Sequence, residues 1–197
     1  MSVQESLQLS DNAPTTGVLE VYKIAEELFD KDKIHFENDF LVVRKTIRVK
    51  SACHGIKRIL NDANRIRKKK NLVLDIGREL VADIMAGRIP ADPISKFAVG
   101  TGGYHGEPDM HVEPPKPQGG DIQLNAEIFE KALDSIEKPN RAANTFIGFI
   151  AENELNGQIL TEWALKSFSG VCFSRATTKP IPKEAGFVYV VRWTIQH

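Results

Sequence analysis

Residues 187–195 read Phe-Val-Tyr-Val-Val-Arg-Trp-Thr-Ile, and this stretch sets the character of the C-terminal half of the chain. Successive side chains of a β-strand point to opposite faces, so residues two apart share a face. One face would carry the large apolar residues Phe187, Tyr189, Val191, Trp193 and Ile195. The other would carry Val188, Val190, Arg192 and Thr194. This alternation predicts a β-strand that packs one face in the core.

Further segments of β-type composition precede this strand. They are residues 94–99, 145–151, 159–168 and 171–176. Asn156-Gly157 between two of them is a dipeptide that favours a two-residue hairpin turn. We therefore predict that residues 94–197 form an antiparallel β domain of the sandwich type.

The N-terminal half has mainly helical spacing of its apolar residues. Residues 17–29, 52–70 and 75–85 predict amphipathic helices, and Gly87 marks the end of the third. Residues 40–43 and 46–50 predict a strand between the first two. The predicted class is α+β, with a flexible arm over 1–16, a helical and basic region over 17–93, and the β domain over 94–197. Residues 122–136 are ambiguous, and the spacing near their end favours helix.

Charge is balanced over the whole chain but not along it. Lysine and arginine number 26, as do aspartate and glutamate, so the formal net charge is zero. Residues 44–70 nevertheless hold eleven basic residues and one acidic residue, a net of +10, so the others sum to −10. Two interpretations of this segment stay open: a solvated helix face balanced by the acidic helix predicted just upstream, or electrostatic contact with nucleic acid or an acidic protein surface. The basic interaction candidates at its end are Arg65, Arg67, Lys68, Lys69 and Lys70.

Several classes of nucleic-acid platform do not fit this basic segment. Residues 44–70 contain no aromatic residue, which argues against base stacking, and no helix-turn-helix or zinc-finger pattern is visible. A net-neutral chain also lacks the overall field of a free DNA-binding protein. Trp163 and Trp193 are predicted as anchors of a sheet or of an interface.

Residues 100–121 form a long segment rich in glycine and proline, and loops of this length are commonly functional. The run Gly-Thr-Gly-Gly at 100–103 follows a predicted strand but opens no helix, so we expect a tight bend and not a phosphate site. His105, Asp109 and His111, with Glu107 between them, are candidate metal ligands, although exposed polar loop residues are the commoner explanation of such a pattern.

No catalytic group stands out elsewhere. The serines at 167, 169 and 174 lack a nucleophile motif, and Cys172 lies in an apolar strand where a thiol is usually inert. Glu152, Glu154 and Glu162 are expected on the surface. The chain has only two cysteines, far apart in the sequence. Its N-terminus is polar and lacks the apolar core of a signal peptide, and no apolar run is long enough to cross a bilayer. These features together predict a reducing, aqueous compartment. We expect no cofactor and no small-molecule substrate.

Two stretches carry a resemblance to a known group of proteins. The first comprises residues 71–82 (Asn-Leu-Val-Leu-Asp-Ile-Gly-Arg-Glu-Leu-Val-Ala), Gly87-Arg88 and residues 94–103 (Ile-Ser-Lys-Phe-Ala-Val-Gly-Thr-Gly-Gly). The second comprises residues 154–157 (Glu-Leu-Asn-Gly), 160–165 (Leu-Thr-Glu-Trp-Ala-Leu), 173–177 (Phe-Ser-Arg-Ala-Thr), 180–183 (Pro-Ile-Pro-Lys) and 192–195 (Arg-Trp-Thr-Ile). In this order they resemble structural proteins of tailed bacteriophages, in tail-fibre attachment, collar or baseplate components.

The resemblance covers residues 71–197 and leaves the basic segment outside it. Where such proteins often have Gly-Leu-Phe after the glutamate, this chain has Trp-Ala-Leu-Lys at 163–166. The resemblance implies a non-enzymatic virion protein, assembled in the host cytoplasm in several copies. Its implied partners are copies of itself and other phage proteins of the tube, baseplate, neck or fibre, with no membrane. The alternative is a nucleic-acid-binding assembly factor that acts through residues 44–70.

Overall fold

The structure is a computed structural model that describes residues 16–29, 34–37, 40–49, 52–60 and 65–196. Its elements in chain order are β1 (Thr16–Ala25), the short 3-10 helix η1 (Glu26–Leu28), β2 (Ile34–Glu37), β3 (Phe40–Val49), β4 (Ala52–Leu60), β5 (Arg65–Val73), α1 (Asp75–Met85), β6 (Ile94–Gly100), β7 (Glu127–Ala132), β8 (Ser135–Asn140), β9 (Ala143–Ile150), β10 (Ile159–Ser167), β11 (Cys172–Pro182) and β12 (Phe187–Gln196).

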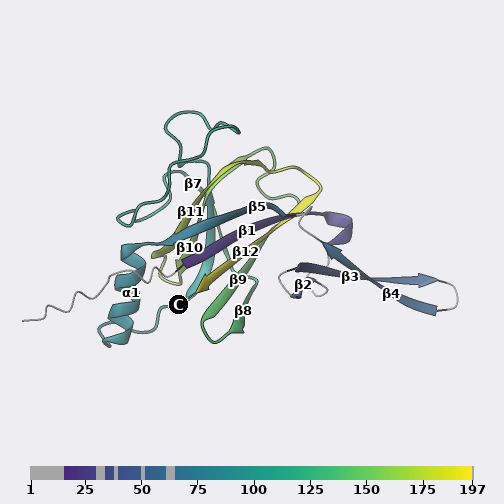
Figure 1. Ribbon diagram of the computed structural model, residues 1–197, viewed down its shortest axis with the longest axis horizontal. Helices are drawn as coiled ribbons and strands as arrows, with labels where there is room; N and C mark the ends of the chain where they lie inside the picture. Colours follow the sequence, from purple (N-terminus) through teal and green to yellow (C-terminus); the bar gives the residue numbers. More distant parts are fainter. Residues whose placement is uncertain (1–15, 30–33, 38–39, 50–51, 61–64, 197) are drawn as a thin grey trace, which may run out of the picture.

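Nine strands form one antiparallel sheet in the order β7-β6-β10-β11-β5-β1-β12-β9-β8. β12 lies between β1 and β9, with Gly17 opposite Ile195 and Trp193 opposite Phe146. β2, β3 and β4 form a separate three-stranded sheet, and the β3–β4 hairpin reaches away from the large sheet (Figure 1).

The large sheet curls until its two edge strands meet. β7 and β8 are those edges, yet only Leu133 and Asp134 separate them in the chain. The Leu133 N–H donates to the Ser95 carbonyl at 2.9 Å, and the Asp134 N–H donates to the Ile147 carbonyl at 2.9 Å. This corner therefore fastens the β6 side of the sheet to the β9 side.

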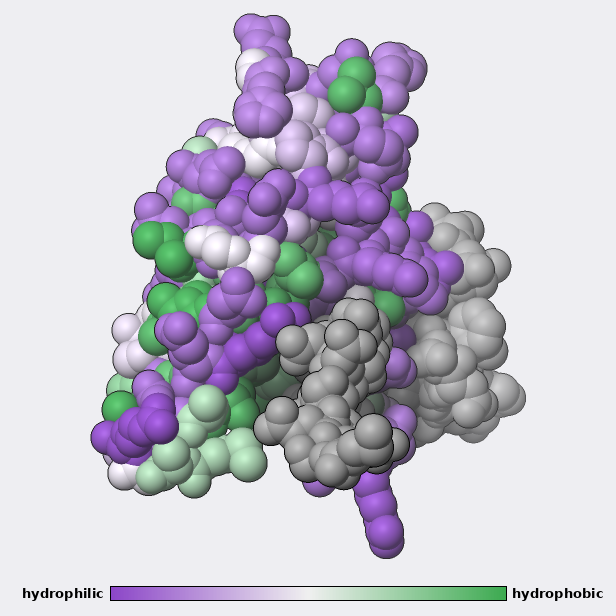
Figure 2. Space-filling view, turned by 60° about the vertical axis from the view of Figure 1, so that its left-hand side comes forward, coloured by the Kyte–Doolittle hydropathy of each residue, from purple (hydrophilic) through white to green (hydrophobic). Residues whose placement is uncertain are grey.

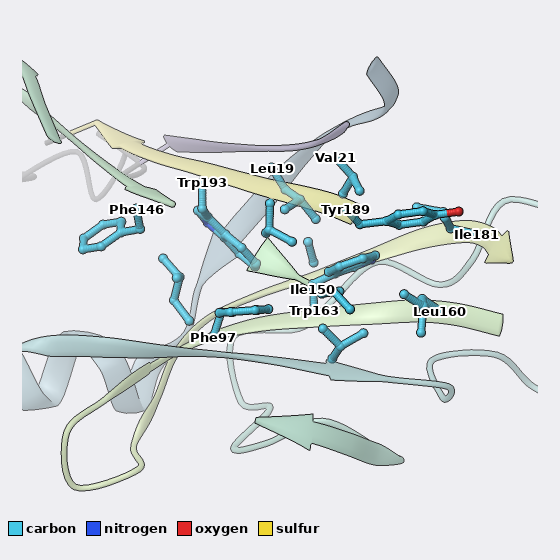
Figure 3. Packing of buried hydrophobic residues seen from close by; sticks show 14 of the residues in the cluster. Leu19, Val21, Phe97, Phe146, Ile150, Leu160, Trp163, Ile181, Tyr189 and Trp193 are labelled. Atoms are coloured by element: carbon cyan, nitrogen blue, oxygen red, sulfur yellow. The ribbon is translucent and has the colours of Figure 1, made fainter. Parts of the chain in front are cut away.

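The inner face of the curl is the main core. Side chains of β1 and β12 point across it toward β6 and β10, with Trp193 and Tyr189 facing Phe97 and Trp163 (Figure 3). A β-carbon at Gly148 would lie 2.5 Å from the Phe97 ring, so β9 and β6 can approach this closely only because residue 148 has no side chain. The alternation predicted for residues 187–195 is confirmed, because the inward set joins this core and Val188 and Val190 join a second cluster on the outer face.

The predicted fold class is wrong. In the described part of the chain, α1 is the single α-helix, at the predicted residues 75–85, and the segments 17–29 and 52–70 contribute strands β1, β4 and β5. β1 is buried on both faces, with Leu19 and Val21 in the main core and Tyr22 and Ile24 in the outer cluster. Burial on both faces removes the alternation of a half-buried strand, and the remaining spacing imitated a helix.

Residues 52–70 form strands because of pairing with segments far away in the sequence. β4 pairs with β3 over nine residue pairs from Leu41–Leu60 to Val49–Ala52, and β5 pairs with β1 from Thr16–Leu72 to Tyr22–Arg65. Such non-local pairing outweighs local helical spacing. The helix favoured near residue 136 is also wrong, since β7 and β8 occupy that segment.

The sandwich expectation fails too, because one curled sheet replaces two stacked ones. Asn156-Gly157 is not a hairpin turn: β9 neighbours β12 and β8, whereas β10 neighbours β11 and β6.

The strands predicted over 40–50, 94–99, 145–151, 159–168, 171–176 and 187–195 are confirmed, with shifts of a few residues. Residues 1–15 of the predicted arm lie outside the described residues. β1 and β5, from the predicted 17–93 region, lie between β11 and β12 in the large sheet.

Candidate functional site

Residues 101–126 follow β6 and fold back over the sheet without helix or strand. They return to β7 and rise above β6 and β11 at the upper left of Figure 1. Leu124 from this segment packs with Ala98, Ala164, Cys172 and Leu74 in a third apolar cluster. We call residues 101–126 the strap, because they lie across several strands of the sheet.

Glu162 of β10 fastens the strap at both ends. Its carboxylate accepts hydrogen bonds from the backbone N–H groups of Gly102 at 3.1 Å, Asn125 at 3.0 Å and Ala126 at 2.6 Å. Thr161, its neighbour in β10, donates from Oγ1 to the Gly102 carbonyl at 2.7 Å. Glu162 is fully buried, so these bonds replace the water that a carboxylate otherwise needs.

Arg175 of β11 completes this network. Its Nη2 donates to Glu162 Oε2 at 2.7 Å and its Nη1 donates to Asp121 Oδ2 at 2.5 Å. Its side chain is 5% exposed. Buried charges are tolerated when they are paired and hydrogen-bonded, and here one buried cation is shared by two carboxylates from the sheet and the strap. We call Glu162, Arg175 and Asp121 the buried charge triad.

The glycines at 100 and 102 allow the backbone to lie close to the Glu162 carboxylate. β-carbons at Gly100 and Gly102 would lie 2.7 Å and 2.6 Å from Glu162 Oε1. Gly103 has φ +85, a left-handed conformation that favours glycine. The run Gly-Thr-Gly-Gly therefore lets a buried carboxylate approach the backbone, and the predicted tight bend is confirmed at Gly103.

A polar pocket of about 180 Å³ lies between the strap and the triad. Arg175 and Thr177 line it from β11, and Tyr104, His105, Gln118 and Asn125 are among the strap residues that line it. Thr177 donates from Oγ1 to the Pro115 carbonyl at 2.6 Å, which fixes the far wall. Figure 2 shows hydrophilic side chains over the upper part of this side of the molecule, at the height where Figure 1 places the strap, and hydrophobic ones gathered below them.

The strap also covers a seam in the sheet. Within the described residues, β5 and β11 pair only at Val73–Ser174 and Leu72–Arg175, and beyond them Pro180 has no N–H to continue the ladder. Glu113 of the strap lies between the two strands, 2.8 Å from Lys69 Nζ and 3.3 Å from Lys179 Nζ. Hydrogen bonds from these two ammonium groups lower the pKa of Glu113.

The basic candidates at 65–70 are mostly occupied within the molecule. Arg65 Nη1 lies 2.9 Å from Glu20 Oε1, Lys68 Nζ lies 3.6 Å from the same atom, and Lys69 pairs with Glu113. Arg67 donates to the Pro180 carbonyl at 3.4 Å. Lys70 is exposed and has no ion pair or side-chain hydrogen bond among the described residues. Most of the basic side chains that were predicted to bind a partner therefore contact acidic or carbonyl groups within the molecule.

Trp163 and Trp193 lie in the main core with exposed fractions of 0% and 1%. Trp163 Nε1 donates to Thr178 Oγ1 at 3.0 Å. They serve as anchors of the sheet, and neither presents a surface to a partner in this conformation.

The candidate metal ligands are not brought together. His105, Asp109 and His111 all lie in the strap, but the described residues contain no group of three or more metal-ligating side chains. Asp109 instead accepts the backbone N–H of His111 at 2.7 Å. Burial raises the pKa of the Cys172 thiol to about 11, which agrees with an inert packing role.

Sequence reasoning missed the buried charge triad. Glu162 was expected on the surface and is fully buried, while Glu152 and Glu154 are half-buried. A signal was present: Glu162 stands inside Leu-Thr-Glu-Trp-Ala-Leu and Arg175 inside Phe-Ser-Arg-Ala, and opposite charges inside apolar strands indicate buried partners.

No family model, curated protein or solved structure matches this chain in the comparisons made. None of the helices in the described residues is long and apolar enough to span a membrane.

Proposed function

We propose that this protein is a non-enzymatic structural component of a tailed bacteriophage particle, at the tail, collar, baseplate or fibre base. It would be assembled in the host cytoplasm, bind copies of itself and other particle proteins, and join neighbouring components. The first support is the resemblance of residues 71–197 to such proteins. The resembling stretches fall on α1, the end of β5, and strands β6, β10, β11 and β12, which all belong to one folded unit.

The observation that carries the proposal is the β3–β4 hairpin. Residues 40–60 contain six basic residues and no acidic residue, so the remainder of this neutral chain has a net charge of −6. The hairpin projects from the large sheet (Figure 1), and among the described strands β4 has β3 as its one neighbour. A projecting cationic element with an open strand edge suits docking on an acidic surface of the next subunit.

The particle itself tests the location. Tailed particles would be banded by density from the phage or lysogen that encodes the chain, and peptides from residues 71–196 quantified against the major tube protein. We expect the protein to co-band with the particles in a fixed ratio. Presence in the lysate together with absence from washed particles would contradict the proposal.

Charge reversal tests the docking role of the hairpin. Arg44 and Lys57 are opposite each other in the β3–β4 register, and both would become glutamate. The control reverses Lys138 and Arg141, which are exposed near the β8–β9 turn. We expect R44E/K57E to lose incorporation into particles and K138E/R141E to keep it.

The alternative function, nucleic-acid binding through residues 44–70, is separated by the same variants. Titration with duplex DNA at increasing salt measures it, because phosphate contacts weaken steeply with salt. Salt-dependent DNA binding that R44E/K57E abolishes, in a protein that is absent from particles, would favour the alternative.

A further inference from the structure

We propose that the polar pocket between the strap and the buried charge triad binds a neutral, hydroxyl-rich ligand of the size of one sugar ring. This inference concerns a site other than the hairpin and stands whether or not the protein belongs to a particle.

The strap beside the pocket is fixed by more polar interactions than a loop needs in order to cross a sheet. A loop can cross a sheet on apolar contacts alone, yet this strap is fixed by three backbone N–H groups on Glu162 and by the bond from Thr177 to Pro115. Burying an ion pair contributes little net stability compared with apolar packing, so Arg175 is poorly explained as a stabilising element. Arg175 instead gives the pocket a rigid polar floor, because a carboxylate accepts a hydrogen bond from each of its two Nη atoms.

Side chains with unused hydrogen-bonding groups line the same pocket. Among the described residues, the side chains of Gln118, Asn125 and His105 have no hydrogen-bond partner, and all three are exposed and line the pocket. Two amides and an imidazole together offer donors and acceptors in the same small volume. Paired donor and acceptor groups match adjacent hydroxyls, since each hydroxyl both donates and accepts.

Charge balance selects a neutral ligand. Arg175 is compensated by Glu162 and Asp121, and Lys116 at the rim offsets the second carboxylate. An anion would have to share the Arg175 guanidinium with Glu162 and Asp121, which already accept hydrogen bonds from its two Nη atoms, and no helix N-terminus is among the lining residues. A metal ion would lack its ligand group among the described residues. The volume of about 180 Å³ admits one ring.

The experiment uses the full chain and a panel of free glucose, galactose, mannose, N-acetylglucosamine and N-acetylgalactosamine, with inorganic phosphate as the anionic probe. Saturation-transfer NMR detects binding and titration calorimetry measures the dissociation constant. The pocket variant is Q118A/N125A, because both side chains are exposed and unpaired and their loss should leave the fold intact. The control is Gln123→Ala, exposed in the same strap outside the pocket.

We expect at least one neutral sugar to bind, and Q118A/N125A to weaken it about tenfold or more through the loss of hydrogen bonds. Gln123→Ala should bind as the parent does. Three results would overturn the proposal: no sugar binds, a bound sugar is unaffected by Q118A/N125A, or phosphate binds in place of the sugars. Unchanged thermal unfolding of Q118A/N125A separates loss of the site from loss of the fold.

Discussion

At the scale of single residues, the main feature of this fold is the buried ion pair between Glu162 and Arg175. Both lie in strands that are buried along most of their length, and both meet under the strap with Asp121. Sequence alone can mark such residues as anomalous but cannot name their partners. The β10–β11 register pairs Glu162 with Thr177 and Ala164 with Arg175, and only this register makes Glu162 and Arg175 diagonal neighbours. The sites that depend on side-chain contact across strands were for this reason beyond prediction.

Removing one member of the triad should leave an uncompensated buried charge. We expect Glu162→Gln to lower the free energy of unfolding by about 3–5 kcal/mol, as for other broken buried pairs. Chemical denaturation measures this, with the exposed Glu107→Gln as a control that should change it by less than about 0.5 kcal/mol. The double variant E162Q/R175M should cost less than the sum of its singles. Strict additivity would mean that the pair is not coupled.

At the scale of elements, α1 depends on one glycine. A β-carbon at Gly77 would lie 2.5 Å from the backbone oxygen of Phe173, so the helix touches β11 at this point. Gly-to-Ala in a helix normally stabilises it, but here we expect Gly77→Ala to destabilise the protein by about 1–3 kcal/mol through overpacking. Thermal unfolding tests the sign. The control Gly120→Ala has open space around it and should be near neutral.

The strap should loosen in acid through Glu113. Lys69 and Lys179 hold the pKa of Glu113 below its ordinary value of 4.5, so the contact is fully present above that value. It is lost as the pH falls through the lowered pKa, because protonation removes the charge that both lysines contact. Hydrogen exchange of strap amides, corrected for intrinsic rates, should accelerate over that range.

Glu113→Gln provides the matched test of this pH dependence. The strap of this variant should exchange faster at neutral pH and should lose the acid-dependent acceleration that we assign to Glu113. A pH profile identical to that of the parent would show that another carboxyl group controls the strap.

At the scale of the whole molecule, closure depends on strands from opposite ends of the chain. β12 lies between β1 and β9, and Trp193, Tyr189 and Ile195 place its inner face in the core. We expect deletion of residues 187–197 to abolish cooperative unfolding and near-ultraviolet dichroism, whereas deletion of residues 1–10, which precede β1, should preserve both. A cooperative transition in the first variant would show that the sheet closes without β12.

The sequence by itself determined the strands whose environment is local and regular. Residues 187–195 are recognisable as a strand because their largest apolar side chains alternate toward the main core. Residues 75–85 have a helical apolar stripe that ends near Gly87, and both elements lie where predicted. The positive region at 44–70 was equally visible, because charge is additive and needs no geometry.

Only the tertiary structure decided where the ambiguous segments pair and what their charges meet. Residues 17–25 became β1 because β5 and β12 pair with its two edges. The main core and the outer cluster bury its two faces, which erases the alternation that marks a half-buried strand. The pairing of β5 with β1 brought Arg65 to Glu20, and the strap brought Glu113 to Lys69. The β3–β4 hairpin was left as the projecting cationic element. The spacing of apolar residues depends only on residues close together in the sequence. Strand pairing depends on segments far apart in the chain, so local spacing does not predict it.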